Sequence, residues 1–207
     1  MDNKIDRTID YHAHILPGVD HGCHSVEMCA KQLDMAVKAR VKVIISTSHF
    51  YPQEERVEEF VKRRAEGLEQ ALPLAAERGI TIVSCAETLW CPGIEKMEGL
   101  SELIAKEAGF NHLLLELPFV EFDSEKVTRT LKKIRQEHGC DILLAHVERY
   151  SFKDITQFDE PYVHYQINAR SFKKPERWLK VHRYMKTGLV AAIGSDIHGL
   201  DDTYRYF

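Results

Sequence analysis

The sequence is poor in features that stabilise secreted proteins or anchor membrane proteins. Its five cysteines form an odd set without any C-x-x-C pair, so neither a disulfide framework nor an all-thiolate zinc site is indicated, and we expect reduced structural thiols. No apolar run approaches the roughly 20 residues that cross a bilayer, and the N-terminal MDNKIDRTID has no apolar signal-peptide core. We therefore expect a cytoplasmic protein that does not insert into a membrane.

Several binding and catalytic signatures are also missing. Lys and Arg are scattered along a chain of net charge -4, so we expect no nucleic-acid partner. Neither GxGxxG nor GxxxxGKS occurs, although open sheets that bind nucleotides usually carry such a loop. No cysteine is followed by an arginine six positions later, which excludes the C-x5-R phosphatase route. Any chemistry must therefore come from other residue types.

The composition is that of one folded domain. With 207 residues, 44% of them hydrophobic and 29% charged, the chain can bury a substantial core, and we expect a single domain over residues 1–207. Seven short runs rich in Ile, Val or Leu predict buried strands, and segments with helical spacing separate them. This alternation indicates an α/β fold with a parallel sheet, either closed into a barrel or open and doubly wound.

The expected elements follow one another without a linker. Strands are expected at RTIDY, VKVIIS, GITIVSC, HLLLEL, DILLAHV, YQIN and LVAAIG, and helices at residues 25–40, 54–77, 100–108, 124–138 and 175–187. Ser25 and Ser124 are typical N-caps, and Gly139 and Gly188 are typical C-terminal stops.

Metal-competent side chains follow these strands with unusual regularity. The C-terminal ends of the strands in a parallel barrel meet on one face, so residues far apart in the chain would share one pocket. His12 and His14 lie two residues apart on a strand and can bind one ion together, and Asp196 and His198 repeat this spacing. The other candidates at strand ends are His49, Glu87, Glu116 and His146.

These ligands outnumber what one ion can use, so the sequence predicts two or three divalent ions. Glu87 and Glu116 sit beside apolar strands, where an unpaired carboxylate would cost roughly several kcal/mol. A salt bridge is the simpler partner, but neither strand has a nearby basic residue. Imidazole combined with carboxylate suits Mn, Fe or Zn better than Cu(I), Mg or Ca. The remaining histidines are expected on the surface or in the core: His24, His112, His138, His164 and His182.

Such a cluster carries excess positive charge and therefore favours an anion. A phosphate monoester, dianionic near neutral pH, fits this charge, and a hydroxide held between metals would be the nucleophile.

Seven segments spanning nearly the whole chain resemble the PHP (polymerase and histidinol phosphatase) superfamily. They are DYHAHILPGVDHG, STSH, CAE, LLLELP, AHVERY, QINARSF and GSDIHGL, in this order. HAHILPGVD and AHVERY are specific to one branch, the bacterial manganese-dependent tyrosine-protein phosphatases of capsular and exopolysaccharide biosynthesis. The resemblance implies the PHP fold, a distorted seven-stranded, TIM-like β/α barrel.

The resemblance also implies three divalent metal ions, with Mn first and Fe or Zn as alternatives. By position, the first ion would take His12, His14, Glu87 and Asp196, the second Glu87, Glu116 and His146, and the third His21, His49 and His198. Arg149, in HVERY, matches an arginine that binds phosphate in the family, and its forked guanidinium suits two phosphate oxygens. A structural salt bridge is the alternative role for Arg149.

Two positions depart from the family pattern. The phosphatase branch usually has D-D-G where this chain has Asp20, His21 and Gly22, so the imidazole of His21 would replace a carboxylate ligand. Family members also usually continue past the SDxH motif through an R-P-containing segment and a final helix, whereas this chain stops at DDTYRYF. We expect a shortened C-terminus, with Arg205 standing in for the family's late arginine in substrate binding.

The implied reaction is hydrolysis of phosphotyrosine by in-line attack of a metal-bridging hydroxide, with Arg149 and the ions neutralising charge. The tyrosine leaves as a phenolate of pKa about 10, so it needs little acid catalysis. Metal-bound water, or His49 or His198 when unligated, would supply a proton. The implied partner is the phosphotyrosine tail of a bacterial tyrosine kinase, which the segments 119–122 and 150–158 would admit.

Two other functions remain open at this point. The chain could be a PHP phosphatase or phosphodiesterase acting on a small phosphoester such as histidinol phosphate. It could also be a weakly active regulatory partner of the kinase, which the shortened C-terminus favours slightly.

Overall fold

Seven parallel strands form one sheet, and their order in space is their order in the chain. The computed structural model describes residues 5–207. Its strands are β1 (Ile9–Ala13), β2 (Val43–Phe50), β3 (Thr81–Leu89), β4 (His112–Glu116), β5 (Asp141–Leu144), β6 (Val163–Asn168) and β7 (Val190–Gly194). A doubly wound sheet reverses its strand order at a switch point, and this sheet does not. The expected seven-stranded barrel is therefore confirmed, and the open sheet is excluded.

The barrel is distorted where its first and last strands meet. The backbone N–H of Asp196 donates to His12 O at 2.7 Å, and that of Ser195 donates to the Asp10 carboxylate at 2.8 Å. The pairing of β1 with β2 also shifts register between Asp10 and Ala13. Side-chain and loop contacts thus join the end of β7 to β1.

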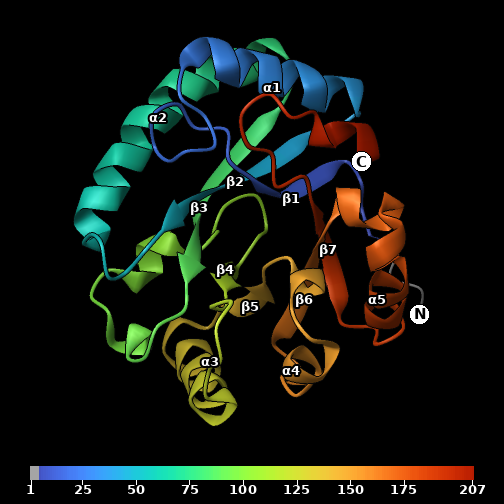
Figure 1. The fold of residues 1–207 in the computed structure, drawn as a ribbon. Helices are drawn as coiled ribbons and strands as arrows, with labels where there is room; N and C mark the ends of the chain where they lie inside the picture. Colours follow the sequence, from blue (N-terminus) through green and yellow to red (C-terminus); the bar gives the residue numbers. More distant parts are fainter. Residues whose placement is uncertain (1–4) are drawn as a thin grey trace.

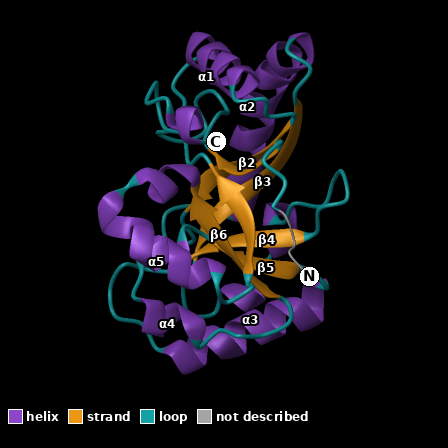
Figure 2. Ribbon diagram, turned by 90° about the vertical axis from the view of Figure 1, so that its right-hand side faces the viewer, coloured by secondary structure: helices purple, strands orange, loops and turns teal. Residues whose placement is uncertain are grey.

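Helices cover the outside of the barrel (Figures 1 and 2). They are α1 (Val26–Lys38), α2 (Val57–Glu77), α3 (Ser124–His138), α4 (Phe152–Thr156) and α5 (Pro175–Met185). Short 3-10 turns connect other elements: η1 (Ile94–Lys96), η2 (Leu100–Leu103), η3 (Val147–Arg149), η4 (Ala169–Lys173) and η5 (Thr203–Tyr206). Among the described helices, none combines the length and the apolar composition of a membrane crossing. Residues 1–4 of the N-terminal segment, where we expected no signal peptide, lie outside the described residues.

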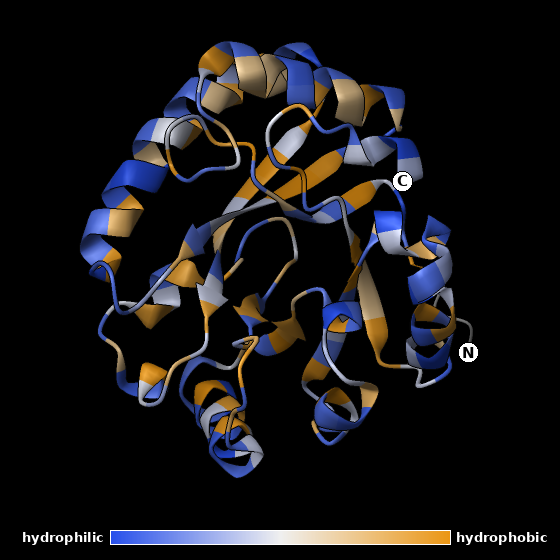
Figure 3. Cartoon of the chain, viewed as in Figure 1, coloured by the Kyte–Doolittle hydropathy of each residue, from blue (hydrophilic) through white to orange (hydrophobic). Residues whose placement is uncertain are grey.

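Two apolar layers hold the barrel and its helices together. The main core packs the outer faces of the strands, such as Ile44 and Leu115, against Leu33 of α1 and Phe60 of α2. Figure 3 shows this pattern, with hydrophobic strands inside and hydrophilic outer helix surfaces. Two smaller buried clusters fill the inner faces, and Tyr11 packs against both: Ile45, Val83, Cys85 and Ala105 in one, and Leu114, Leu143, Ala145 and Ala192 in the other.

The inner clusters explain which side chains reach the site. Residues two apart on a strand share a face, so Cys85 precedes Glu87 on the inner face of β3, and Leu114 precedes Glu116 on that of β4. Apolar layers therefore lie beneath the polar strand ends.

The expected helix over residues 100–108 is wrong. Only Leu100–Leu103 forms a 3-10 turn. The backbone of Ala105 instead pairs with His112, donating to it at 2.9 Å and accepting from it at 3.2 Å, and a continuing helix would use those groups internally. Ala108, with φ 53°, then reverses the chain.

The helix ends are close to their expected positions. Ser25 caps α1 by accepting from the backbone N–H of Met28 at 3.2 Å, and Gly139, with φ 64°, ends α3, as expected. The expected cap at Ser124 is wrong by one residue, because Asp123 accepts from the first N–H groups of α3. Gly188 lies beyond α5, whose C-cap is Lys186.

Candidate metal centre

The carboxylate of Glu87, only 1% exposed, lies among four imidazoles. Its Oε2 is 3.1 Å from His12 Nε2 and 3.3 Å from His14 Nε2. His49 Nδ1 approaches the same oxygen at 3.0 Å, and His146 Nε2 lies 2.9 Å from Oε1. The ends of β1, β2, β3 and β5 thus converge on one buried carboxylate.

Two further carboxylates lie beside the imidazoles of this centre. Glu116 Oε1 lies 3.2 Å from His146 Nε2. Asp196 Oδ1 lies 3.6 Å from Nε2 of both His12 and His14. Asp196 and His146 have left-handed backbones, with φ 50° and 33°. Such conformations in residues other than glycine cost about 1–3 kcal/mol each and persist at functional sites.

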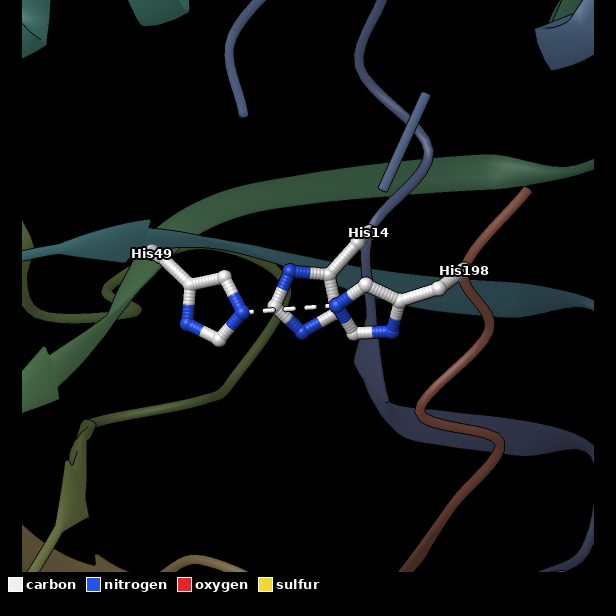
Figure 4. A group of neighbouring side chains, drawn as sticks. All are labelled: His14, His49 and His198. Atoms are coloured by element: carbon white, nitrogen blue, oxygen red, sulfur yellow. Dashed lines mark hydrogen bonds between the residues drawn. The ribbon is translucent and has the colours of Figure 1, made fainter. Parts of the chain in front are cut away.

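The third side of the centre is a group of imidazoles. His49 Nε2 lies 3.3 Å from His198 Nε2, with His14 beside them (Figure 4). The ring of His21 stacks on that of His49, with centroids 4.9 Å apart and planes at 7°, and lies 4.7 Å from the ring of His198. The structure therefore brings together all nine side chains expected to bind metal.

Three groups of donor atoms could each hold an ion, with every atom of a group within 4.8 Å of the others. The groups are His12, His14 and Glu87; His14, His49 and His198; and His49, Glu87 and Glu116. The first lies within the set expected for the first ion. The group of His14, His49 and His198 resembles the set expected for the third ion, with His14 in place of His21. The group of His49, Glu87 and Glu116 resembles the set expected for the second ion, with His49 in place of His146. Imidazole and carboxylate donors without thiolate fit Mn, Fe or Zn.

Charge in the cluster is balanced by protons on the histidines. Burial would raise the pKa of Glu87, but His12 and the hydrogen bonds from His14 and His146 hold it well below its ordinary value. Burial would likewise lower the pKa of His146, but its hydrogen bonds with Glu116 and Glu87 raise it to about 9. In the protein without ions, the positive charge of protonated imidazole therefore compensates the negative charge of Glu87 and Glu116.

Asp20 supports this centre and was not identified as a site residue from the sequence. Its Oδ2 lies 2.8 Å from His14 Nδ1 and accepts from the backbone N–H of His49 at 2.9 Å, while Oδ1 accepts from that of Gly22 at 2.8 Å. Burial would lower the pKa of His14, but Asp20 and Glu87 raise it to about 10. Asp20 thereby orients His14 with Nε2 toward Glu87. The signals for Asp20 in the sequence were the nearby His12, His14 and His21 and its match to the first acid of the family's D-D-G pattern.

Gln166 links four strands and was also missed as a site residue. Its Oε1 lies 3.1 Å from His12 Nδ1 and accepts from the backbone N–H of His146 at 2.6 Å. Its Nε2 donates to Asn168 at 2.9 Å, and Asn168 Nδ2 donates to Asp196 Oδ2 at 2.7 Å. The network fixes the Nδ1–H tautomer of His12 and leaves Nε2 free to bind a cation.

Replacing Gln166 with leucine is expected to weaken metal binding by about 10- to 100-fold, because outer partners of ligands contribute that much. Gln166→Glu keeps an acceptor for His12 and His146, so we expect it to retain more affinity. Titration against a chelating dye measures the change, with circular dichroism to check folding. Gln70→Leu, an exposed position on α2, is the control. Equal affinities for Gln166→Leu and the control would contradict the role of Gln166.

Two glycines allow the chain to pass close to the ligands. A Cβ on Gly22 would lie 2.1 Å from the Cβ of His14, and one on Gly194 would lie 2.4 Å from the Cβ of His12. Real Cβ atoms do not approach this closely, so any side chain at either position would displace a histidine.

The centre opens into a cavity of about 560 Å³ whose lining includes Arg149. Arg149 Nη2 donates to Asp196 Oδ2, and its side chain is 30% exposed. The expected alternative of a salt bridge is thus present, and the guanidinium still borders the cavity. Arg205 does not line this cavity: it is exposed on η5, with its guanidinium 4.7 Å from the centroid of the Tyr206 ring.

The five histidines expected elsewhere are absent from the lining of this cavity. Among them, His112 is buried on β4, and burial lowers its pKa to about 4. His24, His138 and His182 are exposed or partly exposed. These placements agree with the surface or core positions expected for them.

Comparisons with known proteins extend over nearly the whole chain. A profile of the family described as "Capsular polysaccharide synthesis, CpsB/CapC" matches residues 8–205. "Tyrosine-protein phosphatase CpsB" of Streptococcus pneumoniae is 27% identical over 217 residues, which cover 96% of this chain and 86% of that protein.

Solved structures share the barrel. One described as "Crystal structures of YwqE from Bacillus subtilis and CpsB from Streptococcus pneumoniae, unique metal-dependent tyrosine phosphatases" superposes with a TM-score of 0.78 at 18% identity, covering 94% of this chain and 81% of that chain. The spore coat polysaccharide biosynthesis protein SpsE of Bacillus subtilis gives 0.56 at 10% identity, covering 100% and 67%. At these identities the likeness shows the fold.

Proposed function

The chain belongs to the CpsB/CapC family of capsular polysaccharide synthesis, and from this premise we propose that it is a metal-dependent phosphatase of protein phosphotyrosine. The observation that carries the proposal is the environment of Glu87, a buried carboxylate with four imidazole nitrogens within 3.3 Å. A carboxylate so placed is suited to bridge two cations. The name of the Streptococcus pneumoniae relative supports the phosphotyrosine specificity.

We assign the nine converging side chains to three divalent ions, with Mn first and Fe or Zn as alternatives. The first two ions would use His12, His14, Glu87, Asp196, Glu116 and His146, and the third His49 and His198 with His21. When bound, such ions supply Lewis acidity that activates water and neutralises phosphate charge.

The chain's own residues position the phosphoryl group and the proton. Arg149 borders the cavity from η3, where its guanidinium can donate to two phosphate oxygens. Burial and the nearby His14 lower the pKa of His198 to about 4, so its imidazole is neutral at pH 7. A neutral imidazole suits a ligand role but carries no acidic proton, so the expected proton supply by His198 does not fit this environment, and we assign that role to His49 only when it is unligated. A phenolate of pKa about 10 needs little such help.

The partner we propose is the phosphotyrosine-bearing tail of a bacterial tyrosine kinase that acts in polysaccharide assembly. The family's role in capsular polysaccharide synthesis supports this partner. The cavity is open at its mouth beside Phe119 and Val120, so a flexible peptide can approach.

Substrate comparison tests the proposed function. Purified protein loaded with Mn, Fe or Zn would be assayed with a phosphotyrosine peptide, histidinol phosphate and a phosphate bis-ester at equal metal. We expect kcat/KM to be largest for the peptide. A preference for histidinol phosphate or for the bis-ester would replace this function with one of those alternatives. No turnover with any metal would favour the regulatory role.

Metal binding is expected to tighten as the pH rises from 6.5 to 9. The pKa values of about 10 for His14 and about 9 for His146 mean that both hold a proton at neutral pH without ions. An incoming cation must displace these protons, and about two should be released per cluster. Calorimetric titrations in buffers of different ionisation enthalpy measure the release. An affinity independent of pH over this range would contradict the assignment.

The same protons stabilise the protein without ions. Because the folded pKa values of His14 and His146 lie above the ordinary histidine value, their contribution to stability is complete below about pH 6.5. It is lost as the pH rises through 9 to 10. The melting temperature of chelator-treated protein should therefore fall over this range.

A further inference from the structure

Two apolar side chains stand in solvent at the mouth of the metal centre. Phe119 is 62% exposed and Val120 is 73% exposed, on the loop between β4 and α3. Both line the cavity of the metal centre, and both also line a second cavity of about 590 Å³. Apolar groups exposed at the rim of a polar site are typical of a binding surface.

The ring of Phe119 is held in a fixed orientation. It stacks on the ring of Tyr150, with centroids 5.1 Å apart and planes at 8°, and lies 5.9 Å from the ring of His146 at 20°. Tyr150 is itself buried, and its hydroxyl donates to Leu117 O at 2.6 Å. Phe119 is thus supported from within and free on its outer side.

The second cavity continues from this rim away from the metal centre. It lies between residues 118–124 and residues 149–157, and Arg149 lines both cavities. Its lining also includes the polar side chains of Lys153, on α4, and Gln157, just beyond α4, and both are exposed. A molecule bound at the metal centre can extend over Phe119 into this second cavity without leaving the protein surface.

We propose that Phe119 and Val120 bind the aromatic ring of the phosphotyrosine, and that the second cavity binds the peptide residues flanking it. This inference rests on the phosphatase activity proposed above. The ring of phosphotyrosine is bonded directly to the phosphate oxygen, so a phosphoryl group at the metals places the ring at the cavity mouth. Neighbouring residues of an extended peptide advance about 3.3 Å each, which carries them along the second cavity.

The ring contact at Phe119 and the flanking contact in the second cavity should affect the binding of different substrates. Phe119 contacts the ring, so it affects every aryl phosphate, including phenyl phosphate. The wall of the second cavity contacts only what flanks the tyrosine, so Lys153 and Gln157 affect peptides alone. Inorganic phosphate reaches neither part. These differences separate the inference from a general effect on folding or metal binding.

The ring contact is tested with Phe119→Ala. We expect the KM for phenyl phosphate to rise about tenfold, a size in keeping with stacking plus apolar burial, and the inhibition constant of inorganic phosphate to stay unchanged. Phe119→Leu should lie between the wild type and Phe119→Ala. Leu72→Ala, at an exposed apolar position on α2, is the control. A KM for phenyl phosphate within twofold of the wild type would overturn the role of Phe119.

The flanking contact is tested with the double substitution Lys153→Ala and Gln157→Ala. The KM for a phosphotyrosine peptide should rise about fivefold, equivalent to one or two lost hydrogen bonds, with phenyl phosphate unaffected. Lys62→Ala with Gln70→Ala, both exposed on α2, removes the same residue types elsewhere. Equal changes for peptide and phenyl phosphate would overturn the assignment of the second cavity.

Binding without turnover separates this inference from the proposed function. Fluorescence anisotropy would follow a labelled peptide that carries a phosphonate analogue of phosphotyrosine, added to the metal-loaded protein. Weaker binding by Phe119→Ala and by the double variant supports the inference even where no ester is hydrolysed. Binding unchanged by both variants overturns it, whatever the phosphatase activity.

Discussion

Replacing Glu87 with glutamine is expected to lower kcat/KM for a phosphotyrosine peptide by at least about a thousandfold, because the change would remove the negative charge that we propose holds the ions together. An amide keeps the size of the side chain but has one oxygen and no negative charge. His12, His14, His49 and His146 would then surround a neutral group, without the carboxylate that would hold ions at the proposed centre. Elemental analysis of the purified variant should show fewer ions per chain than the wild type.

The matched control for this prediction is Glu66→Gln, an exposed carboxylate on α2 that forms no side-chain ion pair among the described residues. It should keep wild-type metal content and turnover. Normal metal content with lost turnover in Glu87→Gln would mean that Glu87 acts on the substrate and does not hold the cluster. Normal turnover would contradict the proposed function as a whole, since it would assign the activity to a contaminant.

The meeting of the candidate ligands in one place could be predicted from the sequence because it follows from the regular geometry of strands in a parallel barrel. Side chains alternate between the two faces of a strand, and the ends of parallel strands meet at one end of a barrel. Those two regularities place Glu87, Glu116 and His49 together without knowledge of any distance. The same reasoning located His146, although its left-handed backbone at the start of η3 is not visible in the sequence.

The supporting residues could not be predicted in the same way. Gln166 acts by accepting hydrogen bonds from His12 and from the backbone of His146, and those contacts depend on how β6, which pairs with β5 and β7, lies relative to β1 in the barrel. Asp20 lies in a loop, where no periodicity fixes the direction of a side chain. Hydrogen-bond partners therefore require the three-dimensional arrangement, whereas ligands on strands follow from the pattern alone.

The wrong helix at residues 100–108 has a related cause. The spacing of Leu100, Leu103 and Ile104 indicates an apolar helix face, and all three side chains are buried. The backbone of Ala105, however, pairs with the first residue of β4, His112. A tertiary hydrogen bond overrides local helix propensity here.

Replacing Arg149 with alanine is expected to lower kcat/KM by about 100- to 1,000-fold, which is the range seen when one donor to a developing phosphoryl or acyl oxyanion is removed. Metal content should stay near that of the wild type, because Asp196 keeps its contacts with His12, His14 and Asn168. Arg149→Lys retains the positive charge but loses the planar guanidinium that can donate to two phosphate oxygens at once, so we expect partial activity.

Two measurements distinguish substrate binding by Arg149 from a structural ion pair with Asp196. Inorganic phosphate should inhibit Arg149→Ala less strongly than the wild type, since the guanidinium that would hold its oxygens is gone. Arg129→Ala, at an exposed position on α3, should change neither quantity. Loss of metal together with loss of turnover would instead show that Arg149 acts through Asp196. Its ion pair would then stabilise the cluster, and the phosphoryl group would be held by the ions alone.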